Sequence, residues 1–206
     1  MNRATIAAVA ALAAPLLAAG VLAITYAAGD RQTHTCPSGT GTGAGTGGAT
    51  AAGPCAPPGP QAPARPFPGG TAMVPDPSGT GGRVTERMAW AYHEVARVFA
   101  WPWGIGCWDP HLWNPTSDHP KGRACDFTVG AIGVRPTPAQ RVIGWQLAHW
   151  LQADAAALGV SYVIWDGHIW SAARSREGWR VYDGGGIYDP TSITGGHHDH
   201  VHLSVE

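Results

Sequence analysis

The chain has 206 residues, and its 13 Lys and Arg residues nearly balance its 14 Asp and Glu residues, which gives a formal net charge of −1 at pH 7. The sequence contains no run of basic residues, so it lacks the electrostatic footprint of a nucleic-acid-binding protein. We therefore expect no nucleic-acid partner.

The first 28 residues form an apolar segment typical of exported proteins. Arg3 is its only charged side chain, and the rest of the segment is apolar, small or weakly polar. The segment is longer than an ordinary signal-peptide core and long enough to span a bilayer, so residues 1–28 are either a cleaved signal peptide or an uncleaved anchor. Residues 21–23 and 25–27 carry the small side chains that signal peptidase accepts. Both alternatives place the remaining chain outside the cytoplasm, secreted or anchored to the cell surface, and limit membrane contact to this segment.

Residues 29–82 are dominated by Gly, Pro, Ala, Ser and Thr, with few large apolar side chains. Such a segment cannot offset the entropy lost on ordering, so we expect a flexible linker. Cys36 and Cys55 lie within it; they either pair with each other, since exported chains meet oxidising conditions, or remain free or pair between molecules. The compact domain is expected over residues 83–206, which is enough for one domain and too short for two.

The predicted domain begins with an amphipathic helix. Thr85 is a suitable N-cap, and Trp101-Pro102 ends the helix. We interpret the side chains at helical spacing as a buried face rather than a binding stripe; they are Met88, Tyr92, Val95, Ala96 and Phe99. Residues 103–115 show no periodicity and are rich in Trp, Gly and Pro, so they are expected to form a loop.

Residues 117–127, with the sequence S-D-H-P-K-G-R-A-C-D-F, contain the ligand types of a metal site. His119 and Asp126 are too far apart for neighbouring helix positions, but a turn at Gly122 would bring an imidazole and a carboxylate together. The C-terminal run His200-Val201-His202 offers a third ligand, because strand alternation places both histidines on one face. Two histidines and one aspartate leave the fourth corner of a tetrahedral zinc ion open, which is a catalytic arrangement.

Together with the terminal H-H-D-H-V-H of residues 197–202, this motif resembles a family of zinc metallopeptidases. The family includes D-Ala-D-Ala carboxypeptidases, lysostaphin-type endopeptidases and the hedgehog signalling domain, and its joint signature is S-x-H-x-x-G-x-A-x-D with a later H-x-H. The similarity is greatest to a secreted actinobacterial branch ending in H-x-D-H-V-H-x-S, and it covers about residues 83–206. It implies a hedgehog/DD-peptidase-like fold and a zinc ion held by His119, Asp126 and His202.

The resemblance also implies roles around the metal. The zinc ion would lower the pKa of a bound water and polarise a peptide carbonyl. By the family's H-x-H pattern, His200 assists the water or the oxyanion. Asp199 is the competing base, since the carboxypeptidase branch carries a glutamate three residues before the ligand, although its E-x-x-H pattern is absent here. A strand would turn Asp199 away from the metal, so we rank His200 first; His197 is a weaker candidate for contacting substrate.

Two cysteines lie near the metal motif. A disulfide between Cys107 and Cys125 would pin the preceding loop beside Asp126. Zinc binding by Cys125 is the rival interpretation, but adjacent residues on an extended chain point to opposite faces, so Cys125 and Asp126 should not share a metal.

Several other side chains have simpler interpretations. Ser117 bonding to its own turn and Arg123 forming a surface ion pair compete with functional roles for these residues. The remaining histidines are not expected to be ligands: His34, His111, His168 and His198 are expected at the surface, and His93 and His149 on helices.

The second half of the domain predicts one long helix and a small sheet. Thr137-Pro138-Ala139-Gln140 is a capping box with proline at the first helical position, and the helix should end at Gly159. Residues 161–165 and 168–170 are expected strands joined by a tight turn at Asp166-Gly167. Residues 179–182 are an expected edge strand, residues 184–196 a mobile loop and residues 200–205 the last strand. Helices packed on one face of this antiparallel sheet make an α+β domain.

The sequence favours an exported, monomeric zinc peptidase that hydrolyses peptide bonds of peptidoglycan, in the stem peptide or the cross-bridge. A tethered hydrolase resembling wall enzymes meets that substrate first. One alternative is a zinc-bound module that binds wall peptides or a protein without turnover; another is a structural, adhesin-like surface domain. The open zinc position beside His200 argues against the former, and the metal motif argues against the latter. Carboxypeptidase and endopeptidase remain alternatives, because the choice depends on how loops such as residues 184–196 close the cleft.

Overall fold

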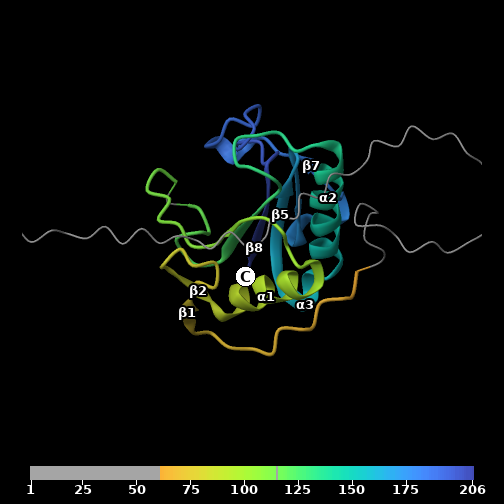
Figure 1. The fold of residues 1–206 in the computed structure, drawn as a ribbon. Helices are drawn as coiled ribbons and strands as arrows, with labels where there is room; N and C mark the ends of the chain where they lie inside the picture. Colours follow the sequence, from red (N-terminus) through yellow and green to blue (C-terminus); the bar gives the residue numbers. More distant parts are fainter. Residues whose placement is uncertain (1–60, 115) are drawn as a thin grey trace, which may run out of the picture. The chain divides into compact units, whose positions relative to one another are not determined.

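The computed structural model describes residues 61–114 and 116–206, which belong to one compact unit. It has the α+β class predicted from the sequence, with a six-stranded antiparallel sheet, a two-stranded hairpin and a few helices (Figure 1). The segment expected to be a signal peptide or anchor (residues 1–28), most of the expected linker, and the residues Cys36, Cys55 and His34 lie outside the described ranges.

The elements have the following bounds. The helices are α1 (Glu86–Phe99), α2 (Pro138–Ala153), α3 (Ala155–Leu158) and the 3-10 helices η1 (Ala172–Glu177) and η2 (Gly184–Gly186). The hairpin pairs β1 (Met73–Pro75) with β2 (Arg83–Thr85). The large sheet has the order β3-β4-β8-β5-β6-β7 and is formed by β3 (Ile105–Gly106), β4 (Ala124–Thr128), β5 (Val160–Trp165), β6 (His168–Ser171), β7 (Arg180–Val181) and β8 (His200–Val205).

Both predicted helix starts are observed. The Thr85 side chain accepts a hydrogen bond from the Met88 amide at the start of α1, and Thr137 and Gln140 form the expected capping box of α2. The helix predicted to reach Gly159 is interrupted at Asp154, whose backbone is not helical (φ −96°, ψ 17°), and α3 forms the final turn. Aspartate is a poor helix former, which is consistent with the break. Within the described ranges, no helix is both long and apolar enough to cross a membrane.

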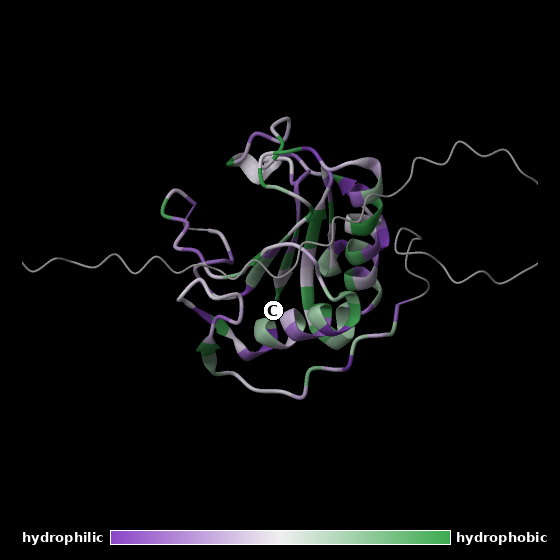
Figure 2. Cartoon of the chain, in the orientation of Figure 1, coloured by the Kyte–Doolittle hydropathy of each residue, from purple (hydrophilic) through white to green (hydrophobic). Residues whose placement is uncertain are grey.

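The two faces of the large sheet have different roles. Along β8, Val201, Leu203 and Val205 belong to the hydrophobic core, so the alternate residues His200, His202 and Ser204 point to the opposite face. Helix α1 contacts β4 and β8, and α2 contacts β5 and β8. Figure 2 shows the hydrophobic colour concentrated in these central strands. The helices therefore cover the apolar face and leave the polar face of the sheet for a site.

The predicted hairpin at Asp166-Gly167 joins β5 to β6. Both turn residues have positive φ (50° and 73°), as a type I′ turn requires. The amide of Asp166 donates to the carbonyl of His197 at 2.7 Å, and the amide of Gly167 donates to the carbonyl of Gly196 at 2.9 Å. The turn thus holds the segment that leads into β8.

The folded unit begins upstream of the predicted boundary at Arg83. Residues 61–82, which we expected to belong to the linker, include the buried Ala64 and the strand β1. Arg65 pairs with Glu94, a fully buried side chain of α1, at 2.5 Å, and the Phe67 amide donates to the Ala157 carbonyl at 2.9 Å. Figure 1 shows this segment, in orange, passing α3 and α1 on its way to β1. Its contacts combine backbone hydrogen bonds, an ion pair, the packing of Ala64 in the core and a contact between the rings of Phe67 and Trp90, which its Gly/Pro-rich composition does not indicate.

Candidate metal centre

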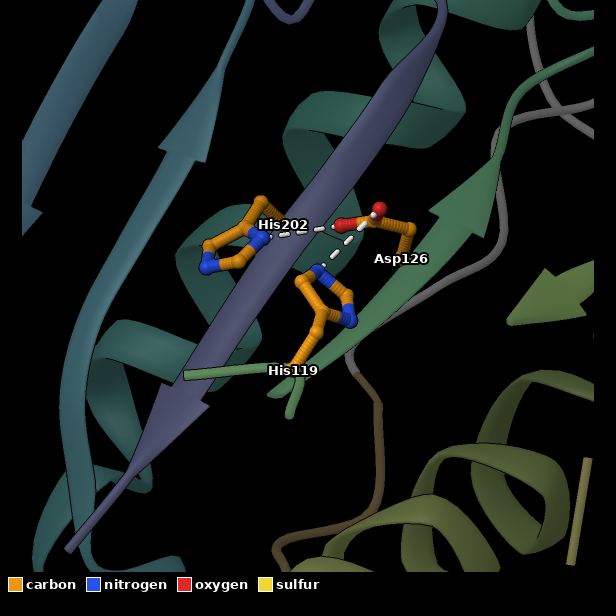
Figure 3. A group of neighbouring side chains, drawn as sticks. All are labelled: His119, Asp126 and His202. Carbon is orange, nitrogen blue, oxygen red and sulfur yellow. Dashed lines mark hydrogen bonds and ion pairs between the residues drawn. The ribbon is translucent and has the colours of Figure 1, made fainter. Parts of the chain in front are cut away.

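The three predicted ligands meet on the polar face of the sheet (Figure 3). Asp126 in β4 is paired directly with His202 in β8, so register places these two side chains together. His119 reaches them through a turn in which the Gly122 amide donates to the His119 carbonyl at 2.9 Å. Gly122 has φ 66°, and a Cβ there would lie 2.6 Å from the Arg83 carbonyl oxygen, so only glycine fits. The turn predicted at this glycine is confirmed.

The donor atoms of this trio are spaced for a metal ion. The Nε2 atom of His119 lies 3.3 Å from Oδ2 of Asp126, and Nδ1 of His202 lies 2.8 Å from Oδ1 of the same carboxylate. One ligand atom from each residue lies within 4.8 Å of the others. Ligands about 2.0–2.2 Å from a tetrahedral ion are separated by roughly 3.3 Å, so the trio could hold a metal with small adjustments.

The ring nitrogen of His119 that faces away from Asp126 bonds to the backbone of a disulfide cysteine. Its Nδ1–H donates to the Cys107 carbonyl at 2.5 Å, which leaves Nε2 as the nitrogen that faces Asp126. Cys107 is bonded to Cys125, so the predicted disulfide is confirmed, and both cysteines are fully buried. Cys125 is therefore not a metal ligand. The disulfide joins the carbonyl that orients His119 to the residue that precedes Asp126.

The ring nitrogen of His202 that faces away from Asp126 belongs to a hydrogen-bond chain through Ser204 to Asp118. The Ser204 hydroxyl donates its only hydrogen to Oδ2 of Asp118 at 3.1 Å, so it must accept from His202 Nε2–H at 3.2 Å. Asp118 also accepts from Tyr162, Lys121 and Arg123. This chain fixes the tautomer that presents the Nδ1 lone pair of His202 to the centre.

The Asp126 carboxylate, His119 Nε2 and His202 Nδ1 thus converge on one point, where a positive charge, either a proton or a metal ion, relieves the repulsion between the lone pairs of His202 and the carboxylate. Burial keeps the pKa of His202 below its ordinary value, so this residue is neutral. Burial disfavours the charged form of His119 too, but the Asp126 carboxylate outweighs it and raises the pKa of His119 to about 9. Burial alone would raise the pKa of Asp126, yet His200 and His119 hold it well below the usual value. A carboxylate with two oriented imidazoles is the donor set of a cation site.

His200 lies beside this trio, with Asp199 behind it. The Nδ1 atom of His200 is 2.7 Å from Oδ1 of Asp199, and its Nε2 faces the centre, 3.7 Å from Oδ1 of Asp126. Oδ2 of Asp199 accepts from the Gly133 amide at 2.6 Å and from the Thr194 hydroxyl at 2.7 Å. Burial would raise the pKa of Asp199, but these bonds, led by that of His200, lower it to about 2. Asp199 is thus a fully buried carboxylate that orients His200, and it lies outside the cavity lining.

The centre opens into a cavity of about 180 Å³. Side chains of the sheet form one part of its wall, and two loops form the rest. Asn114 Nδ2 donates to the Tyr188 hydroxyl at 2.9 Å and so joins the loop before β4 to the loop before β8. The lining residues are His111, Trp113, Asn114, Ser117, His119, Asp126, Tyr162, Ile164, Tyr182, Tyr188, Thr194, His197, His200 and His202.

The structure places several residues differently from the sequence analysis. His111, expected at the surface, lines the cavity with its ring centroid 4.8 Å from that of His119, because Nδ1 bonds to the Ser117 hydroxyl at 3.1 Å. His198 is also mostly buried, since it pairs with Asp166 at 3.1 Å. Neither position was predictable, because both depend on loop paths without periodicity. His93 and His149 lie on α1 and α2, as expected, and both are exposed.

Two further side chains have local partners. The Ser117 hydroxyl accepts from the His119 amide at 3.2 Å, and Arg123 pairs with Asp118 at 2.7 Å. Both are structural contacts.

His197 lines the cavity, where burial and the neighbouring His200 keep its pKa well below the usual value.

Comparison with known proteins matches most of the folded part of the chain to a family. A family described as the VldE C-terminal domain matches residues 80–198, which is more than half of the chain. No curated protein and no solved structure matches the chain.

Proposed function

The chain belongs to the VldE C-terminal domain family, and we propose that it is an exported, zinc-dependent peptidase that hydrolyses peptide bonds of peptidoglycan. The observation that carries this proposal is the open trio of His119, Asp126 and His202 at a cavity, with His200 facing the same point. The likeness of its motifs to the lysostaphin, D-Ala-D-Ala carboxypeptidase and hedgehog type supports it, and we propose a hedgehog-like arrangement of the fold on the same ground.

Zinc is the metal that suits this donor set best. Imidazole is a borderline ligand and carboxylate a harder one; two imidazoles with one carboxylate occur in catalytic zinc sites, where three protein ligands leave one position open. A bound zinc ion would supply Lewis-acid polarisation of a carbonyl and a lowered pKa for water.

The chain's own residues supply the remaining steps. The residues that would hold the metal ion are His119, Asp126 and His202. The carbonyl of Cys107 keeps the imidazole of His119 oriented, and the hydroxyl of Ser204 does the same for His202. His200 presents Nε2 to the cavity because Asp199 holds Nδ1, so it can accept a proton from water or donate a hydrogen bond to developing negative charge. In this proposal Asp199 acts through His200, because its own oxygens are engaged away from the cavity.

The wall substrate and the location are inferred together. The apolar residues 1–28 suit a signal peptide or an anchor, which would place the domain outside the cytoplasm. The confirmed disulfide is consistent with an oxidising compartment. A zinc peptidase at that location would meet the stem peptides and cross-bridges of peptidoglycan as substrate.

The alternative is a module that holds zinc and binds wall peptides or a protein without turnover. The Asp199–His200 pair favours catalysis, because a binding module has no need of a buried carboxylate that orients an imidazole toward the open position.

The test combines zinc content with turnover in three preparations of the full chain: wild type, His200→Ala and His202→Ala. Each is loaded with zinc and incubated with purified cell wall, and released peptides are identified by mass spectrometry. We expect His200→Ala to keep zinc and lose roughly 10²- to 10⁴-fold in rate, as for a lost general base or transition-state donor. His202→Ala should lose both. Zinc-loaded wild type that cleaves no wall peptide would refute the peptidase function in favour of the binding module.

A further inference from the structure

Among the described residues, the cavity at the metal centre is lined without lysine or arginine, and the imidazoles of its lining residues His119 and His200 already face the carboxylates of Asp126 and Asp199. Within the described part of the chain, its wall consists of aromatic, histidine, hydroxyl and amide groups with one isoleucine and the ligand Asp126, and includes neither lysine nor arginine. The cations of the metal motif are engaged elsewhere: Lys121 and Arg123 both pair with Asp118, behind Ser204.

The absence of lysine and arginine from the lining that the structure describes restricts which substrate groups can lie in the cavity beyond the scissile bond. In a carboxypeptidase substrate the terminal carboxylate lies one residue beyond the scissile carbonyl, about 3.8 Å of chain away, and so enters the same cavity. A carboxylate that leaves water without a charged partner loses more hydration than it regains, and proteins meet such groups with arginine or lysine. The positive charge of the metal centre cannot pair with this terminal carboxylate, because a carboxylate bound there would displace the scissile carbonyl.

The exposed edge of the cavity carries an aromatic ring and an acidic side chain, since Asp109 lies 3.7 Å from the lining residue His111. Trp113 is 63% exposed and packs edge-on against Tyr188, with ring centroids 5.3 Å apart, and against His111, 4.9 Å apart. Asn114 and Tyr188 hold the two loops together beside it. The exposed ring therefore has a fixed position at the mouth, where it can cover the neutral backbone of a peptide that continues out of the cavity.

We propose that this centre cleaves internal peptide bonds, in segments that continue uncharged beyond the scissile bond, and does not remove single residues with a free carboxylate. The proposal rests on the peptidase function above and selects endopeptidase from the two alternatives left by the sequence.

Peptide binding tests the proposal without requiring turnover. Three peptides are compared on the full chain: an N-acetylated Lys-D-Ala-D-Ala ending in a carboxylate, the same peptide ending in a carboxamide, and the same peptide extended by two glycines and ending in a carboxamide. Affinity is measured on metal-free protein, so that capture of the carboxylate by the ion is eliminated. We expect both carboxamides to bind at least as tightly as the carboxylate. Tighter binding of the carboxylate would overturn the proposal.

Variants at the mouth provide a matched pair. Trp113→Ala should weaken binding of the extended peptide about 3- to 10-fold, the effect of losing one aromatic contact. Leu112→Ala is the control, since Leu112 is 88% exposed and does not line the cavity; it should leave the affinity unchanged. Equal effects of the two substitutions would remove Trp113 from the peptide-binding surface.

Cleavage separates the two hypotheses. Zinc-loaded protein is incubated with cross-linked and uncross-linked wall peptides. Products that retain two or more residues beyond the cut support internal cleavage, whereas release of single terminal residues overturns it and leaves the peptidase function intact. The absence of any cleavage refutes the peptidase function, and the binding comparison then still decides whether the cavity rejects a carboxylate.

Discussion

Replacing Ser204 with alanine should weaken metal binding although Ser204 is not a ligand. Ser204 is fully buried, and its hydroxyl is the acceptor for His202 Nε2–H. Without it, a buried donor loses its partner, which costs about 1–3 kcal/mol, and the tautomer that aims Nδ1 at the centre is no longer preferred. Since 1.4 kcal/mol is a factor of ten, we expect the dissociation constant for zinc to rise about 10- to 100-fold.

The assay is competition for zinc between the metal-free chain and a chromophoric chelator, for wild type and two variants. Tyr162→Phe is the matched control, because Tyr162 donates to the same Asp118 oxygen at 3.2 Å but makes no hydrogen bond to His202. Its ring, stacked on His202 with centroids 5.4 Å apart, is kept in phenylalanine. We expect Tyr162→Phe to bind zinc about as tightly as wild type. Unchanged affinity in Ser204→Ala, or an equal loss in Tyr162→Phe, would refute the reasoning.

Three further predictions concern stability. The double variant Cys107→Ala/Cys125→Ala should lose about 3 kcal/mol of unfolding free energy in urea titrations, because the disulfide closes a loop with a sequence separation of 18. Burial would raise the pKa of Glu94, but Arg97 and Arg65 lower it from 4.5 to about 2. The ionised Glu94 side chain therefore stabilises the fold fully above pH 4.5, and this stabilisation is lost as the pH falls through about 2. The difference in urea midpoint between wild type and Glu94→Gln should shrink over that pH window, and a constant difference would contradict the prediction. A chain beginning at Arg83 should unfold at lower urea than one beginning at Gln61, since it lacks the Arg65 partner of Glu94; equal midpoints would restore the predicted boundary.

Parts of the metal site were predictable from local rules, whereas the grouping of His119, Asp126 and His202 came from the resemblance of the two motifs to a family, because Asp126 and His202 are 76 positions apart. Strand alternation places His200 and His202 on one face, and the turn of the motif needs a glycine, which the structure shows at φ 66°. The capping signals at Thr85 and Thr137 and the turn at Asp166-Gly167 depend equally on neighbouring residues. Patterns of this kind are visible in sequence because the interacting residues lie within a few positions of each other.

What the sequence left undetermined depends on long-range pairing. Nothing in the run from His200 to Val205 indicates that this last strand lies between β4 and β5 rather than at an edge. The folded structure of residues 61–82 was missed for a similar reason, since Arg65 is held by distant residues: its guanidinium bonds to Glu94, 29 positions away, and its carbonyl accepts from Trp90. The place of His111 in the cavity likewise depends on the path of an aperiodic loop.

The central position of β8 also explains how one short strand serves both the core and the site. A strand between two neighbours has all its backbone groups paired, so its side chains are held more rigidly than those of an edge strand. Val201, Leu203 and Val205 anchor it from the core face, while the alternate residues present His200, His202 and Ser204. Metal ligation and proton transfer both need side chains fixed within a fraction of an ångström, and a fully paired strand with a packed rear face provides that rigidity. A loop would leave the same three side chains free to move apart.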